Sequence, residues 1–241
     1  MTPRRTLQGF CAHVRALRAL RTRRTLGALR RSRGSRVLPW LVAALCAGCA
    51  GRLLPKPPAT PARYTLDSGA PVATAARVAP AGAPTLVVAP PAAAPGFDSL
   101  RMVYLRRPQA LEAYAFHEWV DTPARMLAPL LVRALQDRGA FGAVLQAPSA
   151  AVGHLRLETT LIRLQQDFGT QPSQVRLTVR AVLVDTATRQ PVAWREFDES
   201  APAATDDPAG GAAAAHAATR RVLAALAAFT AEQAAVPRRA P

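Results

Sequence analysis

The chain has 241 residues, room for one or two domains, and its 31 lysines and arginines against 15 acids give a formal net charge of +16. Such a charge is typical of nucleic-acid-binding proteins, but eleven of the arginines lie in residues 1–48, which hold no acid, so the remainder carries only +5 of the +16. With 5% aromatic residues and no apolar run of about 18 residues, the composition argues against an RNA-stacking surface and against a membrane-spanning helix. We therefore expect no nucleic-acid partner.

Residues 1–48 have the features of a secretory signal peptide. An arginine-rich segment is followed by an apolar stretch at 37–48, which as a helix would span about 18 Å and is too short to cross a bilayer. The arginine-rich part is longer than a signal needs. Either translation starts after Met1, or Thr22–Leu26 is a weak twin-arginine signal, or the arginines themselves bind a membrane or nucleic acid.

The apolar stretch ends in the run Cys46-Ala47-Gly48-Cys49, which resembles a bacterial lipobox, although leucine is usual where Cys46 stands. The resemblance implies cleavage between Gly48 and Cys49, a diacylglycerol on the Cys49 thiol and acylation of the new amine. The alternatives are an ordinary secretory signal with an incidental cysteine, or lipidation of Cys46. Residues 49–83 then form the lipidated N-terminus and an Ala/Pro-rich tether, in which proline favours extended backbone.

Residues 84–235 are predicted to be one folded domain, followed by a tail at 236–241. Alternating or β-branched patterns bounded by turn residues predict the strands. They are expected at 63–66 (an ordered patch inside the tether), 85–89, 101–107, 112–119, 142–146, 155–161, 175–183 and 192–197. The apolar phase shifts at Ile162, which indicates a β-bulge.

Two helices are predicted. The first has Thr122 as N-cap and Pro123 at its first position, and Gly139 stops it. Pro129 should kink this helix or delay its start. The second opens at Asp206, Asp207 and Pro208 and is rich in alanine, with Gly210 and Gly211 as a flexible lead-in.

These elements predict an α/β (α+β) fold. A single domain would hold one mixed parallel and antiparallel sheet of about five to six strands with two main helices. The first helix connects the strands at 85–89 and 142–146, which should therefore form a parallel pair.

Motifs for catalysis are missing. The four histidines have no metal-ligand spacing, no cysteine follows Cys49, and no nucleophile elbow, P-loop or dinucleotide motif occurs. We therefore expect no catalytic residue, no metal site, no cofactor and no disulfide framework in the folded part. Two other hypotheses remain, a secreted hydrolase that depends on His117 or Glu118, and a calcium site among five acids. Those acids are Glu196, Asp198, Glu199, Asp206 and Asp207.

A second resemblance to a known family depends on a group of aromatic residues that is followed by a helix beginning with proline. Tyr114, Phe116 and Trp119 are followed by Pro123 to Leu127, and a Tyr-Thr-Leu strand at 64–66 comes before them. In this order, after a lipobox, the chain resembles the ABC-type transport auxiliary lipoproteins, the family of paraquat-inducible protein C, over roughly residues 49–235.

The resemblance implies a lipoprotein without catalytic role, anchored in the outer membrane and facing the periplasm. Its partners would be an MCE-domain protein, an ABC permease and an ATPase of one lipid transport system that links the two membranes. Tyr104, Tyr114, Phe116 and Trp119 are candidates for a partner or lipid surface, with packing in the core as the alternative for some of them. A structural or assembly lipoprotein of another envelope complex is the alternative function, and a homo-oligomer stays open.

Overall fold

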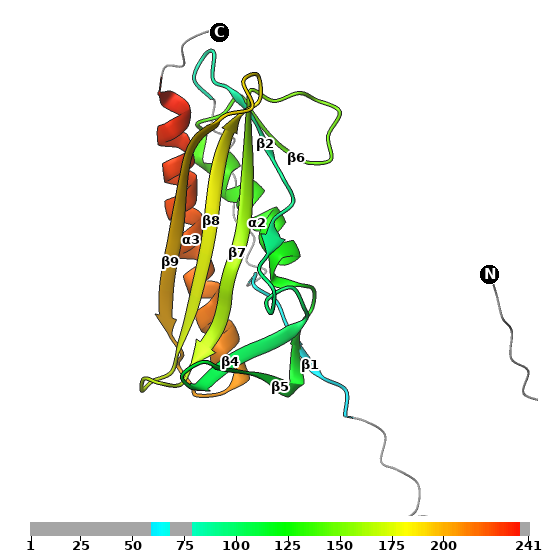
Figure 1. Ribbon diagram of the computed structural model, residues 1–241, viewed down its shortest axis with the longest axis vertical. Coiled ribbons are helices and arrows are strands. Elements are labelled where there is room, and N and C mark those ends of the chain that lie inside the picture. The colour runs from blue at the N-terminus through cyan, green and yellow to red at the C-terminus, as the bar shows by residue number, and fades with distance from the viewer. Residues whose placement is uncertain (1–58, 68–78, 237–241) are drawn as a thin grey trace, which may run out of the picture. The chain divides into compact units, whose positions relative to one another are not determined.

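The structure is a computed structural model that describes residues 59–67 and 79–236 (Figure 1). The predicted signal peptide, its cleavage site at Gly48 and the proposed anchor Cys49 lie outside the described residues. The strands are β1 (Ala62–Tyr64), β2 (Thr85–Val88), β3 (Ala92–Ala93), β4 (Arg101–Arg107), β5 (Ala110–Trp119), β6 (Ala143–Gln146), β7 (Leu155–Asp167), β8 (Gln174–Asp185) and β9 (Pro191–Pro202). The helices are α2 (Pro123–Arg138) and α3 (Pro208–Ala235).

All nine described strands join one mixed sheet, which confirms the predicted α+β class. The count exceeds the predicted five to six, in part because the two-residue β3 has no sequence pattern of its own. β2 and β6 form the expected parallel pair. The expected bulge is also present, as a shift in the β7 register between Leu161 and Arg163.

The longest strand, β7, organises the sheet. One of its edges pairs with β8 along its whole length, and β9 continues this antiparallel meander. The other edge is shared by three strands. β2 pairs near the start of β7, β3 in the middle and β4 near the end, where Tyr104 lies opposite Gln166.

Both helices pack on the same face of this sheet, and α3 lies behind β7, β8 and β9 in Figure 1. The alternation predicted for β7 and β8 puts their apolar side chains on that face, because successive residues of a strand point to opposite sides. Fully buried members of this core include Leu155, Leu157, Leu177, Leu183, Val222 and Leu226. The opposite face is polar. Arg180 is paired there with Glu196 across β8 and β9.

Helix α2 begins and ends where the sequence predicts. Pro123 occupies its first turn, and Gly139 closes it in the left-handed conformation at φ 68°. Thr122 holds the N-cap position but makes no side-chain cap hydrogen bond. Pro129 lies inside the helix and does not delay its start.

Candidate functional site

The β4–β5 hairpin carries an aromatic cluster at the end of the sheet where α3 begins. The rings of Tyr104 and Tyr114 lie 4.5 Å apart between centroids, and Phe168 meets Tyr104 edge-on at 5.8 Å. The guanidinium carbon of Arg106 lies 5.3 Å from the Tyr104 ring centroid and 5.7 Å from that of Phe168. Such ring and cation–π contacts hold the hairpin against the end of β7.

A buried glutamine connects this cluster to α3. The Tyr114 hydroxyl donates to Gln166 Oε1 at 3.0 Å, and Gln166 Nε2 donates to Ser173 Oγ at 2.9 Å and to the Asp207 carbonyl at 3.5 Å. Gln166 is 4% exposed and Ser173 is fully buried. The amide thus has one bond to its oxygen and two from its nitrogen, so its burial leaves neither atom unsatisfied.

The two glycines at the start of α3 are required by close packing. A Cβ on Gly211 would lie 2.2 Å from Gln166 Oε1, and a Cβ on Gly210 would lie 2.2 Å from the Thr205 carbonyl oxygen. The interpretation of this pair as a flexible lead-in is therefore wrong. The glycines let the helix approach the strand and the preceding loop, and Asp207 caps the helix by accepting a 2.7 Å bond from Gly210 N.

His117 joins the cluster from the side of β1. Its Nδ1 lies 3.2 Å from the Tyr64 hydroxyl, and its ring meets Tyr114 edge-on at 5.9 Å. Its neighbour Glu118 lies between Arg63 of β1 and Arg101 of β4 in the sheet register. Both residues of the hydrolase hypothesis thus contribute to strand pairing and packing.

The electrostatics of the cluster keep its phenols protonated. Burial raises the pKa of Tyr114 to about 12. Burial, and then the 3.1 Å hydrogen bond to Glu112, also raise the pKa of Tyr104. Both tyrosines therefore act as neutral hydrogen-bond donors at physiological pH.

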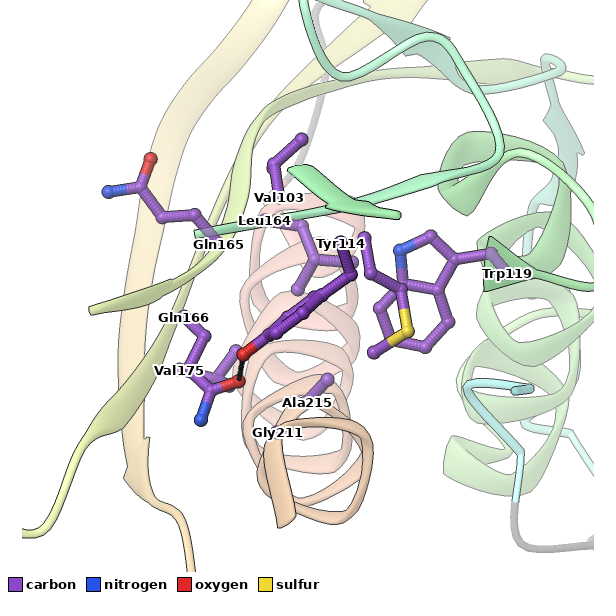
Figure 2. Close-up of a pocket in the computed structure, with 10 residues that line it drawn as sticks. Val103, Tyr114, Trp119, Leu164, Gln165, Gln166, Val175, Gly211 and Ala215 are labelled. Atoms are coloured by element: carbon purple, nitrogen blue, oxygen red, sulfur yellow. Dashed lines mark hydrogen bonds between the residues drawn. The ribbon is translucent and has the colours of Figure 1, made fainter. Parts of the chain in front are cut away.

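The space enclosed by this cluster is small. A cavity of about 10 Å³ lies between Tyr114, Gln166, Trp119 and the start of α3, and Figure 2 shows these side chains turned toward it. That volume holds about one water molecule, so the cluster cannot accommodate a lipid tail in this conformation. Its contacts join the β4–β5 hairpin to β7 and to the start of α3.

The structure divides the four aromatic residues predicted as a partner surface. Tyr104 and Tyr114 stack on each other inside the cluster, and Trp119 lies in the core at 4% exposure. Only Phe116 faces outward, at 56% exposure. The reason is an irregular pairing between β4 and β5. Val103 pairs with Ala113 and Arg101 pairs with Glu118, so β5 residues 114–117 lie opposite a single residue of β4. This bulge breaks the regular alternation of side chains between the two faces of the sheet.

The five acids of the calcium hypothesis are engaged separately. Arginines of β8 bind Glu196 and Asp198, and Arg221 lies 3.7 Å from Glu199. Asp206 accepts a 2.8 Å bond from Ser173 N and Asp207 caps α3. Among residues 59–67 and 79–236, no group of three or more His, Cys, Asp or Glu side chains is arranged to hold a metal ion.

Sequence reasoning missed Gln166 and Arg106 as members of the cluster. The polar pair Gln165–Gln166 at the end of a strand was a usable signal for Gln166, because a glutamine on the helix-facing side must find buried partners. For Arg106 the sequence gives no signal that it covers two aromatic rings.

Solved structures share this α+β fold. Protein XCC0632 from Xanthomonas campestris, of family DUF330, is 27% identical with a TM-score of 0.58, and the match covers 73% of this chain and 94% of that one. A crystal structure of an uncharacterized protein matches at 15% identity and a TM-score of 0.54, over 72% of this chain and 98% of that one. No curated protein matches the chain.

The family model of the ABC-type transport auxiliary lipoprotein component matches residues 64–227, from β1 to the middle of α3. The chain therefore belongs to this family of auxiliary lipoprotein components of ABC-type transport systems, as the order of its motifs predicts. None of the helices in the described ranges is both long and apolar enough to cross a membrane.

Proposed function

We propose that this chain is the outer-membrane lipoprotein of an ABC transport system that moves lipid between the two membranes of the cell envelope. It would be anchored through acyl chains on Cys49 and would face the periplasm. Its partners would be an MCE-domain protein, a permease and an ATPase, with which it acts without catalysing a reaction of its own.

One observation carries the proposal. The family segment at 64–227 follows the lipobox-like run that ends in Cys49, with fourteen residues between Cys49 and Tyr64. Two or more acyl chains contribute about 0.8 kcal/mol for each buried CH₂, enough for stable membrane attachment. Ala50 after the cysteine is compatible with sorting to the outer membrane.

The test of the anchor is metabolic labelling with a palmitate analogue, followed by membrane fractionation. The native chain should be labelled and recovered with the outer membrane, and Cys49→Ser should be unlabelled and absent from the outer-membrane fraction. Cys46→Ser is the matched control and should behave like the native chain. Label that persists in Cys49→Ser, or an unmodified Cys49 thiol in the native protein, would refute the anchor.

The partners are tested by purifying the tagged native lipoprotein after mild crosslinking. Recovery of MCE-domain and permease subunits supports the transport function. Their absence, with recovery of a different envelope complex, would favour a structural or assembly lipoprotein.

A further inference from the structure

A cavity of about 520 Å³ lies under the loop that connects β6 to β7, near the start of β7 and far along that strand from the aromatic cluster. Residues of the loop 147–153 form its wall, and Val87 of β2 and Arg156 of β7, which pair in the sheet register, form its floor. Their neighbours Leu86 and Leu155 are fully buried in the core. Val87 and Arg156 therefore lie on the opposite face of the sheet, which neither α2 nor α3 covers.

Backbone contacts hold this loop against β2 at both ends. At its start, Ala147 N donates to the Val88 carbonyl at 2.9 Å. At its end, Gly153 lies so close to β2 that a Cβ there would be 2.7 Å from Val87 Cγ2. The cavity is thus bounded by a fixed path of the chain, and all three residues Ala147, Gly153 and Val87 line it.

The lining of the cavity is apolar apart from a few groups. Valine, proline and alanine residues form most of it, with Ser149 and Thr186 as uncharged polar members and Arg156 as its one charged member. Val152 in the wall is 84% exposed, more than any other large hydrophobic residue in the described ranges. Apolar walls with a few polar groups, around a volume of about 300–1,000 Å³, are typical of small-ligand sites.

Arg156 is shared between the cavity and one acid outside the lining. Its Nε lies 3.1 Å from Glu158 Oε1, and the two side chains are 44% and 52% exposed, so solvent weakens this pair. The contact is made by Nε and does not use the two terminal nitrogens, which carry four of the five guanidinium donors. A second acid next to the lining, Asp185, accepts hydrogen bonds from the amides of residues 187 and 188 in a turn that also holds Arg189. An anion inside the cavity therefore meets Arg156 first.

The volume limits the length of an apolar ligand. If each CH₂ group takes about the 30 Å³ of a water molecule, one chain of about 16 carbons fills about 480 Å³ and two such chains need about 960 Å³. The cavity of about 520 Å³ therefore matches one chain and is too small for two.

We propose that this cavity binds an amphiphile with one apolar chain and one anionic head group. The chain lies against Val87, Pro148 and Val152, and the anion accepts hydrogen bonds from the terminal nitrogens of Arg156. A carboxylate or a phosphate would serve, because a guanidinium binds both through paired hydrogen bonds. The inference rests on the proposed lipid transport in one respect, because it names a class of lipid that the chain itself holds.

The experiment measures equilibrium binding by isothermal titration calorimetry to the purified full chain carrying Cys49→Ser, so that no acyl chain of its own competes. Decanoate, decyl phosphate and decan-1-ol are the probes, each below its critical micelle or solubility limit. They share one chain length and differ only in the head group, so the two anionic arms distinguish a fatty acid from a lysophospholipid as the source of the ligand.

Two variants test the cavity itself. Ala151→Phe places a large side chain in the wall, and Ala150→Phe is the matched control, because Ala150 is equally an exposed loop residue and does not line the cavity. Ala151→Phe should weaken the binding of all three probes at least tenfold, and Ala150→Phe should leave it within about twofold. Unchanged thermal unfolding curves show that both variants are folded.

Two further variants test the anion site. Arg156→Gln should weaken the binding of the anionic probes about tenfold or more, because hydrogen bonds between charged groups are lost, and should leave decan-1-ol within about twofold. Glu158→Gln should strengthen the binding of the anionic probes about threefold, because it removes a competing acid from Arg156.

No saturable binding of either anionic probe, binding that Ala151→Phe leaves unchanged, or equal effects of Arg156→Gln on decanoate and decan-1-ol would overturn the proposal. None of these results bears on the acylation of Cys49 or on the recovery of transporter subunits, which test the proposed function. Conversely, a chain that copurifies with another envelope complex would remove the transport function and leave the measured binding as it stands.

Discussion

Replacement of Gly211 by alanine tests whether the start of α3 is fixed by Gln166. In an ordinary helix interior this change stabilises by about 1 kcal/mol, because glycine loses more backbone entropy on folding. Here the new Cβ would lie 2.2 Å from Gln166 Oε1 and 2.9 Å from its Cδ. The amide must move, and its bonds to Tyr114 and Ser173 are lost.

The expected loss follows from those bonds. Each net hydrogen bond contributes about 1 kcal/mol, and a buried polar group left unsatisfied costs about 1–3 kcal/mol. After the gain in helix propensity is subtracted, Gly211→Ala should lower the free energy of unfolding by about 1–3 kcal/mol. Urea denaturation followed by far-UV circular dichroism measures this difference, and a thermal melt should show Tm lower by roughly 3–10 °C.

The sign of the effect should reverse when the glutamine is removed. In a Gln166→Ala background the Cβ no longer meets Oε1, so adding Gly211→Ala should recover about 1 kcal/mol. Ala213→Gly, at an exposed position of the same helix, is the control and should cost about 1 kcal/mol. A Gly211→Ala protein that is more stable than the native protein would refute the packing argument.

Two further predictions concern stability. Thr159 is 5% exposed, and its Oγ1 has no hydrogen-bond partner among the described residues. Thr159→Val should therefore raise the free energy of unfolding, measured by urea denaturation, by about 1 kcal/mol. A decrease of similar size would contradict this prediction. Hydrogen bonds, first from Gly210 N, lower the pKa of Asp207 below its usual 3.8. A carboxyl with a depressed pKa stabilises the fold above about pH 4 and loses that contribution as the pH falls through its folded-state value. The urea midpoint should therefore drop less between pH 5.5 and pH 3 in Asp207→Asn than in the native protein, and equal drops would contradict the assignment.

Local chemistry made most of the elements predictable. Pro123 and Gly139 mark the ends of α2 because one needs no amide hydrogen and the other readily adopts a positive φ. The alternation in β7 and β8 and the phase shift at Ile162 likewise reflect which sides of a strand are buried. β3 was not predictable, because two alanines carry no periodicity. They count as a strand only because their backbone pairs with β7, at Thr160 and Leu161.

The candidate site was predictable only in part. Tyr104 and Tyr114 were identified, but the sequence placed them with Phe116 and Trp119 as one set. The irregular β4–β5 pairing puts Trp119 in the core and leaves Phe116 in solvent. A strict alternation along β5 cannot anticipate this bulge, because the bulge is defined by the pairing of β5 with β4 and not by the sequence of β5 alone.

By itself the sequence determined the family, the ends of α2 and the buried faces of β7 and β8, because caps, turns and periodicity depend on residues within a few positions of each other. Only the tertiary structure shows that β7 pairs with three strands along one edge, that Gln166 fills the space beside Gly211, and that Phe116 lies next to the start of β1. These features join residues that are tens of positions apart. Their physical cause is close packing and the pairing of buried polar groups, which act only once the chain has folded.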